Sequence, residues 1–236
     1  MNQTSHLVNN QLLRNLPKVE YQRIKPHLEF IDIPLGQILY EPNQQMEWVY
    51  FPENCVISLV SILSDNSMTE IGLIGNEGMV GLPIILGVKE ATHQAIVQWT
   101  GTAIKISSKV LKQEFQQQKT LYNILLLYTA IRLNKIAQTA VCKSNHQIKQ
   151  QFCRWLLSVQ DSVQSDEFCF TQILISKMLG VRRASVTQVA QQLRNQGIIN
   201  YQRGRITIIN RRALENNTCE CYHFMKNDYY RLLGAT

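Results

Sequence analysis

The spacing of hydrophobic positions changes several times along the chain, and each change predicts a different kind of element. From Leu7 to Leu28, apolar residues recur at near-helical spacing on both sides of Pro17, which predicts two short helices. From Phe30 to Ile106, short apolar or alternating runs are separated by turn residues, which predicts a β-sandwich or barrel-like roll. The expected strands cover residues 30–33, 38–40, 48–51, 56–63, 68–74, 95–99 and 102–106.

A stretch without proline or glycine follows, from residue 107 or 108 to about 140, and predicts one helix of roughly 30 residues, about 45 Å long. One side of this helix carries four residues in line: Leu121, Leu125, Tyr128 and Arg132. We expect this stripe to pack against the same stripe of a second copy, with ordinary core packing as the alternative. Further helices are predicted over 146–163 and 212–233.

Segment 171–210 has the spacing of two short helices joined by a tight turn. Gly180 stands where such a turn requires a positive φ. The helix predicted after it, over about 183–196, has three apolar residues at i, i+3 and i+7: Val186, Val189 and Leu193. The outward positions hold Arg, Ser, Thr and Gln, which suit base edges and phosphates. The pattern is typical of a helix-turn-helix.

A β-hairpin is predicted after Gly197, where the apolar period changes from 3.6 to 2. The run Gln202-Arg203-Gly204-Arg205 supplies its turn and places two cations at the tip, as in the wing of a winged helix. The alternative is a small helical subdomain with a solvated basic face. The candidate DNA contacts are Thr171, Arg182, Arg183, Ser185, Thr187, Gln188, Arg203 and Arg205.

The net charge of +7 is unevenly distributed, and its distribution supports DNA as a partner. Residues 1–108 hold 6 Lys and Arg against 10 Asp and Glu, whereas the rest of the chain is strongly basic. The basic excess therefore coincides with the predicted helix-turn-helix half, as expected of a polyanion-binding region.

Composition and motifs argue against several other classes of protein. With 45% hydrophobic and 17% charged residues the chain is globular, and no apolar run reaches the length of a membrane span. The polar start has no export signal, so we expect a cytoplasmic protein. Hydrolase and metalloprotease motifs are absent, which argues against an enzyme.

The six cysteines are expected to be reduced and structural, and no metal or other cofactor is predicted. Only Cys219 and Cys221 are closely spaced, and no second Cys/His pair stands at zinc-finger spacing. A redox or metal role is the alternative.

Glycine recurs in the predicted roll at five positions: Gly72, Gly75, Gly78, Gly81 and Gly87. The run matches neither a dinucleotide-binding nor a Walker-type motif. Sharp turns and bulges are one interpretation, and a small-ligand cradle of exposed backbone N–H groups is the other.

The order of a β-roll, a long helix and a winged helix resembles the Crp/Fnr family of bacterial transcription regulators. The most specific part is LGVRRASVTQVAQQLRNQGIINYQRGRITIIN, and the segments YFPENCVISLV, EIGLIGNEGMVGLP, AIVQ and CECY resemble one branch of that family. The resemblance implies an α+β protein: a cyclic-nucleotide-binding-like β-roll with N-terminal helices (1–108), a dimerisation helix (109–143) and a winged helix-turn-helix domain (144–236).

The resemblance also implies roles for individual residues. The family's principal base-reading arginine falls on Arg183, its second reader, often Glu, on Ala184, and its third on Gln188. Arg183 could bind a guanine and Gln188 an adenine, whereas the missing acidic reader makes the best-known half-site of the family doubtful.

The effector side departs further from the family. The cyclic-nucleotide-binding Glu and Arg-Ser/Thr pair are replaced by Leu82 and His93-Gln94, and burying a phosphate without its cation is costly. Cyclic AMP is therefore not expected, nor is an iron-sulfur cluster, because the first cysteine is Cys55. A lone His93 is read as structural. An effector pocket, if used, is expected at Gly78, Gly81, Leu82, His93 and Gln94.

The expected partners are double-stranded DNA, a second copy of the chain, RNA polymerase by family resemblance, and an effector of unknown identity. We expect a dimer that reads an imperfect palindrome. The alternative function is a ligand-sensing module whose helix-turn-helix half docks a protein.

Overall fold

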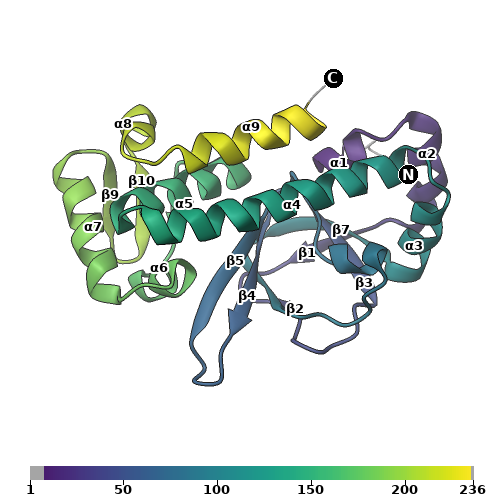
Figure 1. Cartoon of the computed structure of the whole chain (residues 1–236), viewed down its shortest axis with the longest axis horizontal. Coiled ribbons are helices and arrows are strands. Elements are labelled where there is room, and N and C mark those ends of the chain that lie inside the picture. Colours follow the sequence, from purple (N-terminus) through teal and green to yellow (C-terminus); the bar gives the residue numbers. More distant parts are fainter. Residues whose placement is uncertain (1–7, 235–236) are drawn as a thin grey trace, which may run out of the picture. The chain divides into compact units, whose positions relative to one another are not determined.

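The computed structural model describes residues 8–234, which form two compact units. One unit comprises residues 8–57 and 74–129, and the other comprises residues 58–73 and 130–234. No helix within 8–234 has both the length and the apolar character that crossing a membrane requires. Figure 1 shows the helices and strands of both units, most of them labelled.

Two short helices flank Pro17, as predicted. They are α1 (Gln11–Arg14) and α2 (Lys18–Ile24), followed by the 3-10 turn η1 (Lys25–His27). The buried side chain of Asn10 caps α1 and donates a hydrogen bond to the Gly78 carbonyl at 2.8 Å, which fixes the helix to the roll. Leu7, where the apolar pattern begins, lies outside the described residues.

The predicted roll is confirmed, and all seven expected strands are present. They are β1 (Glu29–Ile33), β2 (Ile38–Tyr40), β3 (Trp48–Pro52), β4 (Val56–Ile62), β5 (Met68–Ile74), β6 (Gln94–Trp99) and β7 (Gly101–Ser107). One sheet has the order β1-β7-β3 and the other β2-β6-β4-β5. The short turn η2 (Leu82–Leu86) lies between β5 and β6. The core is formed by alternate residues of the strands, such as Val49 and Phe51, which are fully buried.

The glycines of the roll are largely explained by close packing and turns. A Cβ on Gly78 would overlap the Tyr128 hydroxyl, and one on Gly72 would overlap the Arg132 guanidinium. The Tyr128 hydroxyl occupies the space beside Gly78 and accepts a hydrogen bond from the Met79 amide at 3.2 Å. Gly81 has φ of +98°, a left-handed conformation that favours glycine. At these positions, the turn interpretation accounts for the sequence without a ligand.

The prediction of a single helix from residue 108 to 140 is wrong, because the chain breaks between α3 (Ser108–Gln116) and α4 (Thr120–Asn145). Gln118 adopts a left-handed conformation with φ of +52°. The Glu20 carboxylate, on α2, accepts hydrogen bonds from the Thr120 and Leu121 amides, both at 3.1 Å. A carboxylate at a helix N-terminus is favourable, so Glu20 defines where α4 begins.

The stripe expected to face a second copy is instead buried within the chain. Leu121, Leu125, Tyr128 and Arg132 are at most 7% exposed. The apolar residues that α4 exposes are Leu126, Leu127, Leu133, Ile136 and Val141. Helical spacing predicted the stripe, but tertiary packing, which spacing does not reveal, covers it and leaves other apolar residues of α4 exposed.

The unit of residues 58–73 and 130–234 is called the helix-turn-helix unit, and it continues after α4 with α5 and ends with two helices. Its elements are α5 (Ile148–Val163), β8 (Glu167–Cys169), α6 (Gln172–Leu179), α7 (Arg183–Asn195), β9 (Ile199–Gln202), β10 (Arg205–Ile208), α8 (Arg211–Asn216) and α9 (Cys221–Leu233). The sheet order is β8-β10-β9, so the predicted hairpin gains a third strand that the sequence did not indicate. The predicted helical tail is divided into α8 and α9.

A buried carboxylate lies between α5 and residues 58–73 of the same unit. Glu70 is 9% exposed and accepts hydrogen bonds from Ser58 Oγ at 2.5 Å and from Trp155 Nε1 at 3.1 Å. Burial raises the pKa of the Glu70 carboxyl, and these two hydrogen bonds oppose the increase.

Candidate nucleic-acid interface

The helix-turn-helix has the geometry that its apolar spacing predicted. Val186, Val189 and Leu193 of α7 are at most 7% exposed, whereas Arg183 and Gln188 project into solvent. Gly180 ends α6 with φ of +67°, and its amide donates to the Lys177 carbonyl. Because that side of α7 is buried, the opposite side, with Arg183 and Gln188, faces solvent.

The N-terminus of α7 is not capped by a side chain. Arg182 occupies the N-cap position, but its side chain makes no capping hydrogen bond and is exposed. The first amides of a helix are available to anions when no cap uses them, and the helix dipole favours negative charge there. Together with the Arg182 side chain, this end of α7 suits a phosphate.

Two of the predicted contact residues also hold the motif together. Thr171 is the N-cap of α6, where its hydroxyl accepts a hydrogen bond from the Leu174 amide at 3.1 Å. The Thr187 hydroxyl lies 2.7 Å from Gln172 Oε1 and 3.1 Å from the Arg183 carbonyl, so its single proton is used within the motif. Sequence analysis did not single out Gln172, which links α6 to α7 through Thr187.

The wing ends in a two-residue turn with both central residues in the left-handed conformation. Arg203 has φ of +51° and Gly204 has φ of +82°, as in a type I′ turn. Glycine adopts this conformation freely, but for arginine it costs about 1 kcal/mol. The exposed side chains of Arg203 and Arg205 flank Gly204, whose α-carbon faces the Thr171 methyl group. The wing tip and the start of α6 therefore lie together.

The base of the wing is fixed to the rest of the motif through Tyr201. Its hydroxyl donates to the Phe170 carbonyl at 2.7 Å. Burial raises the pKa of Tyr201 to about 12, and the neighbouring Arg183 cation acts in the opposite direction. The charge of Arg183, at the start of α7, therefore acts on Tyr201 at the base of the wing.

The electrostatic character of the segment is uniform. Residues 171–210 contain six Lys and Arg and no Asp, Glu or His. All six cations are exposed: Lys177, Arg182, Arg183, Arg194, Arg203 and Arg205. No carboxylate within the segment competes with an incoming phosphate for these cations. Ser185 is half-buried near the start of α7.

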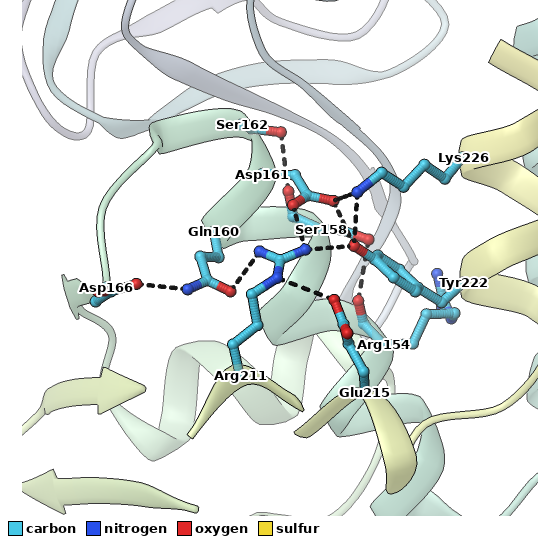
Figure 2. A network of polar contacts seen from close by, with 10 residues as sticks. All are labelled: Arg154, Ser158, Gln160, Asp161, Ser162, Asp166, Arg211, Glu215, Tyr222 and Lys226. Atoms are coloured by element: carbon cyan, nitrogen blue, oxygen red, sulfur yellow. Dashed lines mark hydrogen bonds and ion pairs between the residues drawn. The ribbon is translucent and has the colours of Figure 1, made fainter. Parts of the chain in front are cut away.

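A polar network behind α7 joins three helices of the unit (Figure 2). Arg211, at the start of α8, donates to Gln160 Oε1 at 2.7 Å, to Asp161 Oδ1 at 2.8 Å and to Glu215 Oε1 at 2.9 Å. It also donates at 2.7 Å to the Tyr222 hydroxyl of α9, which in turn donates to Asp161 Oδ2 at 2.7 Å. The network fixes α5, α8 and α9 as a support for the recognition motif.

The predicted effector residues lie in the other unit, in two segments. Gly78 and Gly81 lie between β5 and η2, and Leu82 begins η2. His93 directly precedes β6, which begins at Gln94. Gln94 is 7% exposed and donates to Glu41 Oε2 at 2.9 Å, while its own Oε1 has no hydrogen-bond partner. Burial lowers the pKa of His93. The Glu41 carboxylate makes this place unfavourable for a phosphate.

Comparison with known proteins agrees with this architecture. Residues 150–216 match the family model of the Crp-like helix-turn-helix domain. Among curated proteins, none matches the chain by sequence.

Three solved structures share the fold over most of the chain. FixK2 from Bradyrhizobium japonicum superimposes with a TM-score of 0.70 at 16% identity, covering 81% of this chain and 98% of its own. The c-di-GMP-responsive global regulator CLP of Xanthomonas campestris gives 0.66 at 14% identity, covering 81% and 99%. A transcriptional regulator of the CRP family from Thermus thermophilus gives 0.66 at 14% identity, covering 79% and 95%.

The roll, the long helix and the winged helix-turn-helix form the fold that this chain shares with these solved structures. Residues 150–216 are matched as a Crp-like helix-turn-helix domain, and the chain has the fold of solved regulators of the Crp/Fnr family.

Proposed function

We propose that the protein is a homodimeric regulator that binds a specific palindromic DNA site by placing α7 in the major groove. The observation that carries this proposal is the exposed, carboxylate-free surface formed by the start of α7 and the wing tip. In a symmetric dimer, two recognition helices about 34 Å apart would enter successive major grooves on one side of the duplex.

The exposed side chains divide into base readers and phosphate ligands. Arg183 can donate two hydrogen bonds to a guanine, and Gln188 can pair with an adenine, each worth roughly 1 to 3 kcal/mol of discrimination. Arg182, Arg203 and Arg205 supply phosphate contacts, which give affinity and salt dependence. Ser185 and Thr171 lie beside them and would add neutral hydrogen bonds to the backbone. Thr187 acts mainly by holding α7 against Gln172.

The proposed dimer interface is the exposed apolar side of α4. The stripe expected from the sequence is buried within the chain and is not available for it. Leu126 and Leu133 are one heptad apart and are 38% and 63% exposed, and Ile136 continues the same side at 46%. Side chains of this kind at heptad spacing form the seam of a two-helix coiled coil.

The β-roll would gate this activity by binding an effector at Gly78, Gly81, Leu82, His93 and Gln94. A ligand there acts only if it binds one arrangement of the protein better than another. The Glu41 carboxylate on Gln94 favours a neutral or cationic group over a cyclic nucleotide phosphate. RNA polymerase in the cytoplasm is the partner through which bound DNA would be transcribed.

Band-shift titrations of Arg183→Ala and Arg203→Ala on specific and scrambled duplexes test the assignment. Arg183→Ala should lose its preference for the specific site, because it removes a base contact, and should remain dimeric. Arg203→Ala should weaken binding to both duplexes alike, because it removes a phosphate contact. Equal losses on both duplexes for Arg183→Ala would refute its role. Binding that does not change with salt would favour docking of a protein by the helix-turn-helix.

A further inference from the structure

Four potential metal ligands from two distant parts of the helix-turn-helix unit converge. Cys142 and His146 are one turn apart at the C-terminal end of α4, and Cys219 and Cys221 lie just before and at the start of α9. The four ligand atoms all lie within 4.8 Å of one another. Three of the residues, Cys142, Cys219 and Cys221, are at most 3% exposed. Buried thiols gathered around one point need a physical explanation beyond ordinary packing.

The distances fit a single tetrahedral metal ion. With Zn–S bonds of about 2.3 Å, two sulfurs of a tetrahedral site lie about 3.8 Å apart. The Cys142 and Cys219 sulfurs are 3.5 Å apart, and the Cys221 sulfur is 3.6 Å from His146 Nδ1. An iron-sulfur cluster would need a wider arrangement, because its iron and sulfide atoms lie between the cysteines. The cluster of side chains is therefore sized for one ion.

The orientation of His146 matches that of a metal ligand. Its Nδ1 faces Cys221, inside the cluster, and its Nε2 lies 3.2 Å from the Glu220 carboxylate, outside it. A metal-bound histidine commonly donates its second ring N–H to a carboxylate, which fixes the tautomer and presents the other nitrogen to the ion. Gln138 Nε2 also donates to the Cys221 sulfur at 3.1 Å, as expected for a thiolate acceptor.

A positive charge next to the cluster is also complementary to a metal ion bound by three thiolates. Arg154 is 8% exposed, its Nε has no hydrogen-bond partner, and its guanidinium interacts with the Cys142 thiol. Within the described chain, Arg154 has no carboxylate at ion-pair distance. The buried Glu70 carboxylate interacts with Arg154 electrostatically but makes no ion pair with it, and a buried cation without a close anion is costly. A divalent ion with three thiolates carries one negative charge, which would balance Arg154.

We propose that Cys142, His146, Cys219 and Cys221 bind one zinc ion. Four protein ligands complete the tetrahedron and leave no open position, so the ion is structural and not catalytic. It joins the end of α4 to the start of α9 across 77 residues and so restrains the C-terminal helices of the DNA-binding unit. The proposal does not depend on which DNA site the protein reads.

Metal analysis of the full-length protein tests the site directly. Protein purified with reductant and added Zn²⁺, then passed through a chelating resin, should retain one zinc per chain. Cys219→Ser and Cys142→Ser should lose it, whereas Cys169→Ser, at an exposed cysteine outside the cluster, should retain it. Wild-type protein without zinc, or equal zinc in Cys219→Ser, would overturn the proposal, as would a Cys142–Cys219 disulfide detected by mass spectrometry in protein purified with reductant.

A second variant separates metal binding from folding. The Glu220 side chain is 78% exposed, so Glu220→Gln should fold normally and weaken zinc affinity by about 10-fold to 100-fold in a chelator competition. Replacement of zinc by Co²⁺ should give the thiolate charge-transfer and d–d bands of a tetrahedral Cys₃His site. Unchanged affinity in Glu220→Gln, an octahedral cobalt spectrum, or acid-labile sulfide in the purified protein would contradict the assignment.

Discussion

Arg211→Ala should destabilise the helix-turn-helix unit, because Arg211 is the centre of the network that joins α5, α8 and α9. Its ion pairs with Asp161 and Glu215 involve side chains that are each about one-third exposed, at 31% to 34%, so water screens them. Each pair then contributes at most about 1 kcal/mol. The substitution also leaves the oxygen of Gln160, a residue only 6% exposed, without its donor. Leaving a buried acceptor without a hydrogen bond costs about 1 to 3 kcal/mol of stability.

The expected total is about 2 to 4 kcal/mol, because Tyr222 keeps its bond to Asp161 and adds little. Arg212→Ala is the matched control, since it removes the same charge one residue away from an exposed side chain. Urea unfolding of the full chain can be followed by Trp155 fluorescence, with Trp48 and Trp99 replaced by Phe. The midpoint should fall by about 1 M or more for Arg211→Ala and hardly change for Arg212→Ala. Equal midpoints for the two variants would refute the reasoning.

Two further predictions concern the dimer and the buried carboxylate. Leu133→Glu should convert the proposed dimer to a monomer in sedimentation experiments and weaken binding to a palindrome, because it places a charge in the apolar side of α4. Leu86→Glu, at a similarly exposed leucine of the other unit, is the control. A dimeric Leu133→Glu would exclude this interface. Burial raises the pKa of Glu70, so the folded protein favours the protonated carboxyl. Protonated Glu70 stabilises the fold fully below the unfolded pKa of 4.5, and this stabilisation is lost as the pH rises through the folded pKa. Glu70→Gln should remove that loss of stability. The melting temperatures of the wild-type protein and of Glu70→Gln, measured from pH 5 to 8, should therefore diverge with rising pH. Parallel curves would contradict the buried-charge explanation.

The elements with a strong local pattern were predictable from the sequence. The strands of the roll, the turn at Gly180 and the buried side of α7 all follow from spacing, because period and turn residues are local properties. The turn at Arg203 and Gly204 was also predicted, although the left-handed arginine was not. The individual DNA contacts and the domain boundaries remain predictions.

Features that depend on distant contacts were missed. The start of α4 is set by Glu20, about a hundred residues earlier, so no local signal marked the break near Gln118. Which apolar residues of α4 are covered depends on contacts with residues distant in the sequence. Cys142 and His146 lie far in sequence from Cys219 and Cys221, and only the fold brings the two pairs together.

The absence of any carboxylate or imidazole from residues 171–210 has a consequence for how the regulator responds to acidity. The segment therefore holds none of the residue types that ordinarily titrate near neutral pH, and burial raises the pKa of Tyr201 to about 12, so that its hydroxyl remains neutral there. The recognition surface therefore presents a constant charge to the duplex near neutral pH. Any sensitivity of gene control to proton concentration must arise in other parts of the protein, among groups such as Glu70.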